Sequence, residues 1–480
     1  MDAILKSRWS QAGLALALVI VIVGIAFRPY WRDEYWALYF SGRELSLHDA
    51  IAARMTRDVH PPLYFIAQHF WRAPIEAEWW ARIYNALVVV ACGAGVWLLG
   101  RARRTETALF LLLCAGSYWV IYYSVELRMY GQLFGLCALS VVVMRNALAD
   151  PQKVSIPAFV FLMIGAAAGL THFFGALWIA VAGFWTGLAL LRLGSWRGFL
   201  AWGAASVLAL VPVIAWIAAI HPEHNPGADS VMLPWGQALY FAAEQFLRGL
   251  IVKTAGSNLA AFALLCVMAW PLLKRRDPFD AALALAALTV TLAAFAIHIF
   301  VTPLIKERAF IVIMPALLYL MTRAIDLAAT SGAAPRLRAA IPIFCLISPL
   351  FFLSEYSKDR ERWHGLRALI AAQGPACADA PILVYNRHSE QAADFHGYVT
   401  HMALRGAAGG RDPALLDSET VTHAPAAGAC SVRALAMALP KGEGAEQAAA
   451  RRAFFAAGLD LSRLEERRFG GGRQLAYVSR

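Results

Sequence analysis

Two adjacent carboxylates follow the first long apolar segment of the chain. That segment, Gln11 to Phe27, carries no charge and is long enough to cross a bilayer, for which about 17–25 apolar residues suffice. Asp33 and Glu34 come soon after it. A carboxylate is costly to hold beside hydrocarbon, so such residues at a membrane surface are candidates for function. The pair could take a proton from a hydroxyl nucleophile, or it could simply cap the N-terminus of a surface helix.

A second polar string follows at Asp58-Val59-His60-Pro61-Pro62. Asp58 and His60 offer a carboxylate and an imidazole two residues apart, and we expect both to contact substrate. The alternative is that His60 only fixes a turn, because the residue before a proline is held in an extended conformation. The sequence leaves both interpretations open.

Further polar residues are expected at helix ends on the same side of the membrane. When a bond to a lipid phosphate breaks, negative charge builds on that phosphate, and arginine or lysine at the membrane surface can stabilise it. Structural roles are the alternative, either an ion pair within the chain or an anchor at the interface. A histidine on that side, His172, is more typical of a loop than of a metal site. The candidates for substrate binding here are Glu126, Arg128, Tyr130, Lys306 and Arg308.

The elements that must position these residues are membrane helices. Hydrophobic residues make up 60% of the 480 residues and charged residues only 16%, against about 25% charged in soluble domains. The mean hydropathy is +0.55, and the apolar residues occur in blocks. We therefore predict an all-α polytopic membrane protein. The excess of 43 Lys and Arg over 32 Asp and Glu fits cytoplasmic loops and does not indicate a nucleic-acid partner.

About eleven transmembrane helices are predicted. Basic residues recur in every second loop, which is the pattern of cytoplasmic loops, so the N-terminus is expected inside and the candidate residues outside. The apolar blocks lie at 11–27, 83–100, 106–123, 130–145, 156–171, 173–191, 198–220, 258–273, 280–301, 309–325 and 339–354. Basic residues assigned to the cytoplasmic loops include Arg101, Arg103, Arg104, Arg145, Arg192, Arg276 and Arg323.

Two regions differ from the apolar blocks. Residues 28–82 mix charges with Trp, Tyr and Phe, which predicts interfacial helices within a transmembrane domain of residues 1–355. Residues 356–480 are richer in charge, glycine and alanine, which predicts a small extracytoplasmic α/β domain. Its expected strands are 381–385, 432–439 and 474–478, and its expected helices are 390–404 and 444–458.

The cysteines follow the same division. Five of the seven lie in apolar blocks and are expected as small core residues: Cys92, Cys114, Cys137, Cys266 and Cys345. Cys377 and Cys430 lie in the polar C-terminal region, where an oxidising compartment would allow a disulfide. The sequence leaves that pairing open.

Taken in order, Asp33-Glu34, Asp58 to Tyr64, Glu126 to Tyr130 and Glu307-Arg308 resemble the motifs of the protein O-mannosyltransferase/aminoarabinose transferase superfamily of membrane glycosyltransferases. The resemblance covers residues 1–355 and implies the C-type glycosyltransferase fold and an inverting transfer from a polyprenyl-phosphate-sugar donor outside the cytoplasm. It assigns the essential carboxylate to Asp33, with Glu34 beside it, and the lipid-phosphate contacts to Arg128, Lys306 and Arg308. The chain departs from the aminoarabinose transferases before the two prolines, where Val59-His60 replaces an acidic-basic pair. Their metal site is therefore not carried over.

The predicted function is a hexosyl- or pentosyltransferase in a membrane, expected to be a bacterial inner membrane, that passes a sugar to a lipid, glycan or protein acceptor. The metal ligands are unknown, a divalent metal is left open and no other cofactor is predicted. The alternative is a transporter or ligase of polyprenyl-linked glycans. Transporters usually carry their polar groups near the bilayer midplane, whereas the candidates here gather at one face, which favours the enzyme.

Overall fold

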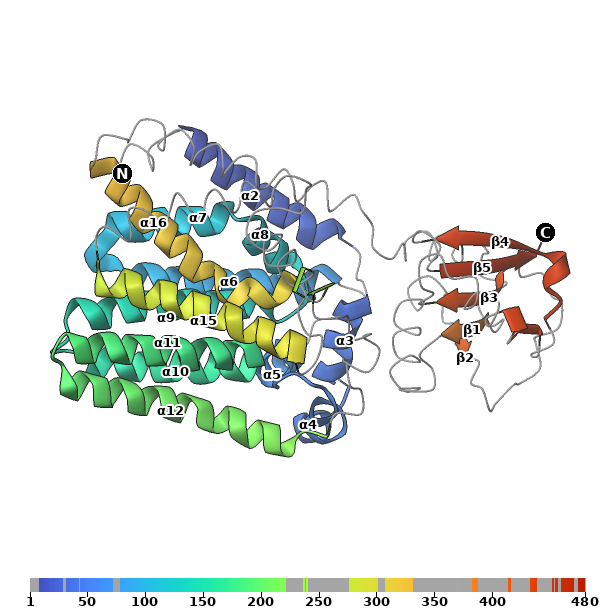
Figure 1. Cartoon of the computed structure of the whole chain (residues 1–480). Helices are drawn as coiled ribbons and strands as arrows, with labels where there is room; N and C mark the ends of the chain where they lie inside the picture. Colours follow the sequence, from blue (N-terminus) through green and yellow to red (C-terminus); the bar gives the residue numbers. More distant parts are fainter. Residues whose placement is uncertain are drawn as a thin grey trace. The chain divides into compact units, whose positions relative to one another are not determined.

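The computed structural model divides into two compact units (Figure 1), one formed by Met1–Ala26, Leu45–Arg72 and Trp79–Glu355, the other by Phe27–Glu44, Ala73–Glu78 and Tyr356–Arg480. Each is described by itself. The described residues are 8–28, 32–42, 44–71, 78–221, 236–237, 239–240, 276–300, 307–330, 369, 382–386, 413–415, 432–437, 451–452, 454–455, 459–469 and 474–479.

The first unit is a bundle of long apolar helices. Its shorter apolar helix α10 (Ser155–Thr171) packs against α9, α11 and α12, and α11 packs in turn on α15. Large apolar side chains such as Val207 and Ile214 stay exposed, as expected of surfaces that face lipid. The six described helices long and apolar enough to cross a membrane are α2 (Arg8–Phe27), α6 (Glu78–Leu99), α9 (Tyr130–Ala149), α11 (Phe173–Arg192), α12 (Trp196–Ala219) and α15 (Pro278–Phe300).

These helices confirm the predicted all-α polytopic membrane fold and make the chain an integral membrane protein. The predicted spans at 258–273 and 339–354 lie outside the described residues, so the count of eleven stays a prediction. The predicted interfacial region contains short helices, among them α4 (Leu47–Ala53) and α5 (Leu63–Trp71) in the first unit.

One predicted span is broken in two. The apolar block at 106–123 forms α7 (Arg104–Gly116) and α8 (Tyr118–Val125), which meet at an angle of 64°. Ser117 between them is extended, with φ −75° and ψ 129°, and its amide bonds to the carbonyl of Cys114. Every side chain of α8 is buried. The break therefore turns α8 into the protein interior, where it leads to the start of α9.

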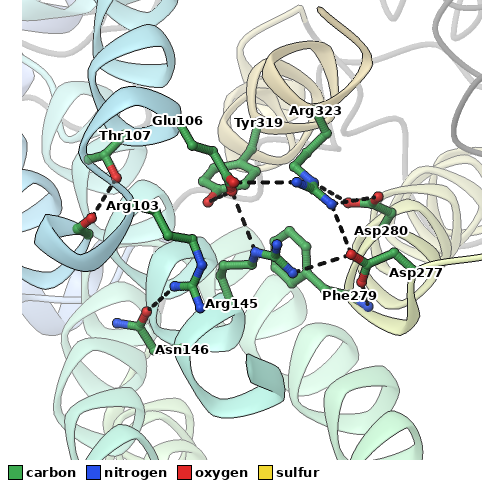
Figure 2. A network of polar contacts seen from close by, with 11 residues as sticks. Arg103, Glu106, Thr107, Arg145, Asn146, Asp277, Phe279, Asp280, Tyr319 and Arg323 are labelled. Carbon is green, nitrogen blue, oxygen red and sulfur yellow. Dashed lines mark hydrogen bonds and ion pairs between the residues drawn. The ribbon is translucent and has the colours of Figure 1, made fainter. Parts of the chain in front are cut away.

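A network of buried charges joins four helices at the other end of α9 (Figure 2). Arg323 of α16 (Met314–Thr330) is 2% exposed, and its guanidinium lies 2.9 Å from Asp277, 3.0 Å from Asp280 and 3.3 Å from Glu106. Arg145 of α9 lies 3.5 Å from Glu106 and 3.4 Å from Asp277. The assignment of Arg145 and Arg323 to loops is thus wrong. Both lie within helices, where their charges are matched to buried carboxylates of α7 and of the start of α15.

The second unit contains α3 (Arg32–Ser41) and a five-stranded sheet in the order β2-β1-β3-β5-β4. β1 pairs in parallel with β2 and β3, whereas β5 pairs antiparallel with β3 and β4. The strands are β1 (Ile382–Asn386), β2 (Pro413–Leu415), β3 (Val432–Met437), β4 (Leu464–Phe469) and β5 (Gln474–Ser479).

Three of the five strands match the predicted ones, β1, β3 and β5, while β2 and β4 were not predicted. The predicted helix at 390–404 lies outside the described residues, as do Cys266, Cys345, Cys377 and Cys430. In the first unit, Cys92, Cys114 and Cys137 are buried and form no disulfide, which confirms their expected place in the core.

Candidate functional site

The polar string before α5 forms a carboxylate–imidazole pair. Asp58 follows a short 3-10 turn (Met55–Arg57) in an extended conformation, and its Oδ1 accepts the amide of Val59 at 2.8 Å. The Nδ1 of His60 lies 3.0 Å from Oδ2 of Asp58. Asp58 is buried and His60 is partly buried. The carboxylate thus occupies Nδ1 and leaves Nε2 as the ring nitrogen that can meet a ligand.

The imidazole of His60 lies against a second imidazole that comes from far along the chain. The ring centroids of His60 and His172 are 5.3 Å apart. His172 separates α10 from α11, and its Nδ1 accepts the amide of Phe174, so it caps the N-terminus of α11. Its ring also lies 5.7 Å from that of Tyr130, the first residue of α9. Helix packing therefore brings three loop or helix-end residues into one cluster.

Two arginines lie over the ring of Tyr130. The guanidinium carbon of Arg128 is 6.0 Å from the ring centroid, and that of Arg308 is 5.7 Å from it. Arg128 precedes α9, whereas Arg308 lies in a 3-10 segment (Glu307–Val312) before α16. Tyr130 is 3% exposed and Arg128 5% exposed. Positive charge from two separate elements is thus concentrated at one buried aromatic face, which is an arrangement suited to an anion.

The loop that carries Arg128 is hydrogen-bonded to α6. Asn85 of that helix is fully buried, and its Nδ2 donates to the carbonyl of Arg128 at 2.9 Å and to the carbonyl of Glu126. The hydroxyl of Tyr64 in α5 donates to Oδ1 of Asn85 at 3.1 Å. Glu126 itself is buried, and its carboxylate accepts the hydroxyl of Tyr122 at 3.3 Å. These bonds fix the loop, and with it the direction in which α9 begins.

The electrostatics of the cluster keep one imidazole neutral. Burial lowers the pKa of His172 well below its ordinary value, and the charges of His60, Arg128 and Arg308 lower this pKa further. The neutral ring is also the form that can accept the amide of Phe174. Positive charge in the cluster is therefore carried by the arginines, not by His172.

Comparisons with known proteins identify the fold of the chain. No family model and none of the curated proteins compared matches the chain. The crystal structure of ArnT from Cupriavidus metallidurans in the apo state matches with a TM-score of 0.59 at 14% identity, over 98% of this chain and 97% of that chain. The structure of the same protein bound to undecaprenyl phosphate matches with a TM-score of 0.60 at 14% identity, over 98% of both chains. This chain has the fold of ArnT.

The ArnT fold is the one that the sequence resemblance predicts, so that prediction is confirmed. A weaker likeness exists to an archaeal oligosaccharyltransferase, AglB from Archaeoglobus fulgidus in complex with an inhibitory peptide and a dolichol-phosphate. Its TM-score is 0.44 at 12% identity, over 87% of this chain and 66% of that chain.

Within the ArnT fold, the predicted site residues are distributed as follows. The structure brings five of the predicted residues together with His172. These six residues are called the Tyr130 cluster: Asp58, His60, Arg128, Tyr130, His172 and Arg308. Glu126 lies in the same loop as Arg128 and has its carboxylate at Tyr122. Asp33 and Glu34 lie in α3, in the second unit, where Glu34 is fully buried. The side chain of Asp33 and the whole of Lys306 lie outside the described part of the chain.

Two members of the site were missed from the sequence. His172 was noted only as a loop histidine, because nothing near it in the sequence points to His60. Asn85 carries a detectable signal, since an amide inside an apolar block is costly unless it has a polar partner. Among the described residues, no group of three His, Cys, Asp or Glu side chains could hold a metal ion.

Proposed function

We propose that the chain is an inverting glycosyltransferase that moves a sugar from a polyprenyl-phosphate donor to a lipid, glycan or protein acceptor. The observation that carries the proposal is the pair of guanidinium groups over Tyr130, beside the Asp58–His60 pair. The fold supports it, because the same fold occurs in ArnT, whose structure was solved with undecaprenyl phosphate. A lipid phosphate is the type of ligand that two arginines at a helix end can bind.

Arg128 and Arg308 would bind the phosphate of the donor. In the reaction the bond between the anomeric carbon and the phosphate oxygen breaks, and its electron pair stays on that oxygen. Guanidinium groups already in place stabilise the charge that develops there, without reorganising at the moment of reaction. Their origin in two separate elements would allow them to hold the phosphate from two directions. Lys306, two residues before Arg308, is a further candidate for the same role.

A carboxylate would take the proton of the acceptor hydroxyl. As the hydroxyl oxygen attacks the anomeric carbon on the face opposite the phosphate, its proton must pass to a base within hydrogen-bonding reach. We assign this role to Asp33, with Glu34 as its neighbour, on the strength of the sequence resemblance. Displacement of the phosphate from the opposite face inverts the configuration of the sugar.

The Asp58–His60 pair would position the donor. With Nδ1 held by Asp58 at 3.0 Å, His60 presents Nε2 as a hydrogen-bonding group of fixed orientation. Tyr130 and Glu126 complete the list of residues that we place at the substrate. A divalent metal is neither required by this scheme nor excluded by it.

The placement of the protein in the membrane is part of the proposal. Basic residues in alternate loops support a cytoplasmic N-terminus, with the Tyr130 cluster at the extracytoplasmic end of its helices. In the same frame, residues 1–355 form the transmembrane domain and residues 356–480 an extracytoplasmic α/β domain. A bacterial inner membrane fits this arrangement, since activated donors outside the cytoplasm must be carried on a lipid.

The test is a transfer assay in membranes supplied with a radiolabelled polyprenyl-phosphate sugar, scored for donor binding and for product. Asp33→Asn should bind the donor and lose transfer by 10²-fold or more, the size typical of a removed general base. The double variant Arg128→Gln/Arg308→Gln should lose donor binding. Arg57→Gln, an exposed arginine outside the Tyr130 cluster, is the matched control and should behave as wild type.

Four outcomes would contradict the proposal. Full transfer by Asp33→Asn would remove that residue from the role of base. Unchanged donor binding by the double arginine variant would separate the Tyr130 cluster from the phosphate. Movement of the donor across the membrane without any transfer would favour a transporter, and transfer of a whole oligosaccharide from a diphosphate carrier would favour a ligase.

A further inference from the structure

A cavity lies between α11 and α15, at the end of the bundle opposite the Tyr130 cluster. Its volume is about 510 Å³. Apolar side chains from both helices form most of its wall, and Trp185 is fixed across the gap because its Nε1 donates to Thr289 of α15 at 3.0 Å. The wall includes Trp185, Leu188, Leu193, Pro278, Ala281 and Leu285. Because α11 and α15 are membrane-spanning helices, this groove is a place where a lipid chain can lie.

Two arginines line one end of the groove. Arg192 is the last residue of α11, and Arg276 lies two residues before Pro278, the first residue of α15. Both side chains are exposed. Within the described part of the chain, neither has a carboxylate within ion-pair distance. Two positive charges therefore lie at the edge of an apolar groove, and neither forms an ion pair with another described residue.

The two carboxylates that also line the groove do not cancel this charge. Asp277 and Asp280 are held by Arg323, at 2.9 Å and 3.0 Å, on the interior side of α15 (Figure 2). Arg145 forms a second ion pair with Asp277, at 3.4 Å. The network holds three carboxylates, with Glu106, against two guanidinium groups, and Arg192 and Arg276 add two positive charges. The balance at this end of the groove is therefore positive, and the exposed part of it is carried by Arg192 and Arg276.

The backbone at Arg276 supports a built site. Its φ of 53° lies in the left-handed region, which non-glycine residues rarely adopt. The next residue, Asp277, caps α15 by accepting the amide of Phe279 at 2.9 Å, and Pro278 opens the helix. The capped N-terminus of α15 thus holds Arg276 in its left-handed conformation. Backbone strain of this kind is common at binding sites.

We propose that this groove binds one anionic phospholipid, with an acyl chain between α11 and α15 and the phosphate at Arg192 and Arg276. A basic pocket between membrane helices is the chemistry that recognises such headgroups. The donor of the proposed reaction is a less suitable occupant, because the 20 residues of α11 separate Arg192, at the charged end of the groove, from His172 by about 30 Å. The phospholipid proposal is therefore independent of the proposed transfer reaction.

Native mass spectrometry of the purified full-length protein tests the proposal. The protein is titrated with phosphatidylglycerol or with phosphatidylcholine carrying the same acyl chains. Both lipids carry a phosphate, but the ammonium group of phosphatidylcholine cancels its charge. At a factor of roughly five for each arginine near an anionic lipid, phosphatidylglycerol should be preferred by roughly 25-fold, and Arg192→Gln/Arg276→Gln should lose that preference. The matched control is Arg101→Gln/Arg104→Gln, which removes two exposed arginines outside the groove and should keep it.

A second variant tests the groove without altering its charge. Ala284 is an exposed residue of α15 that lines the cavity, so Ala284→Trp should fill the space and displace the lipid while the transfer activity persists. Equal retention of the two lipids by the wild type would overturn the proposal. So would an equal loss in both arginine double variants, which would indicate general surface charge. Preferential retention of undecaprenyl phosphate, lost in Ala284→Trp, would reassign the groove to the donor.

Discussion

Replacing Arg323 with methionine should destabilise the protein more than almost any other single change. The side chain is 2% exposed and contacts three carboxylates, Glu106, Asp277 and Asp280, between 2.9 and 3.3 Å (Figure 2). Without it, the three carboxylates are left with Arg145 as the nearest matching cation in the described network. Methionine fills a similar volume, so the change removes the charge while leaving little cavity.

The expected loss is about 3–5 kcal/mol of the free energy of unfolding, because truncating one partner of a buried ion pair leaves the other charge uncompensated. Gross attraction is larger, about 4 kcal/mol per pair at 4 Å with an effective dielectric constant of 20, but much of it is offset by the cost of burying the ions. A double variant, Arg323→Met/Asp280→Leu, removes one charge of each sign. It should recover most of the loss, since a buried pair replaced by apolar residues is often neutral in stability.

Thermal unfolding in detergent, followed by intrinsic fluorescence, measures the effect. At about 2 °C per kcal/mol, Arg323→Met should unfold about 6–10 °C below wild type. Arg101→Met, which removes an exposed arginine at the same end, should stay within about 0.5 kcal/mol of wild type. The reasoning fails if Arg323→Met unfolds at the wild-type temperature, or if the double variant is no more stable than the single one.

Three further predictions concern the Tyr130 cluster. His172→Asn keeps a side-chain cap for the amide of Phe174 but removes the titrating imidazole. Because folding lowers the pKa of His172, the stability of the wild type should fall as the pH drops below about 6.5, the pKa in the unfolded chain. The variant should lose less stability over the same pH range. Asn85→Leu removes the side-chain donor of the Arg128 carbonyl, whereas the Glu126 carbonyl keeps the amide of Arg128; the change should cost about 1–3 kcal/mol and lower transfer more than stability alone explains. Gly131→Ala would place a Cβ 2.6 Å from the carbonyl oxygen of Tyr123, a backbone clash expected to cost about 1–3 kcal/mol in thermal unfolding.

Each of these three has a result that would count against it. Parallel loss of stability with falling pH in wild type and His172→Asn would show that His172 is not the titrating group. Full transfer activity in Asn85→Leu would show that the loop before α9 does not depend on that amide. Wild-type unfolding of Gly131→Ala would mean that α8 and α9 can move apart at no cost.

The membrane helices were predictable because lipid leaves so few alternatives. A backbone in hydrocarbon must satisfy its own hydrogen bonds, so each long apolar block becomes a helix. The break at Ser117 was not predictable, since both halves of the block are apolar and serine is compatible with a helix interior. In the sheet, β4 (Leu464–Phe469) was missed because its four central residues are charged. Among the described strands it lies at an edge and pairs only with β5, and charged side chains are common on such edges.

The grouping of the candidate residues was predictable where they lie close in the chain and unpredictable where packing brings distant segments together. Asp58 and His60 are two residues apart, so their pairing follows from local geometry. The contact of His60 with His172 needs α5 and α10 to pack, and more than a hundred residues separate the two rings in the chain. Arg323 was mistaken for a loop residue because basic residues near the ends of apolar blocks usually mark loops. Its carboxylate partners lie on other helices.

The two polar regions lie at opposite ends of one helix, and their separation follows from the cost of charge in a membrane. Tyr130 begins α9 and Arg145 lies fifteen residues later, which is about 22 Å along the axis. Between them the helix is almost entirely apolar and buried, because an ionisable group at that depth is expensive. At the Arg145 end, arginines from two helices lie at ion-pair distance from three carboxylates, and these ion pairs hold the helices together. At the Tyr130 end, arginines from two segments lie over the ring of Tyr130, and each such contact is worth about 0.5–2 kcal/mol. If these arginines bind the donor phosphate, as proposed, loss of their charge should lower ligand binding, whereas loss of Arg323 should lower stability.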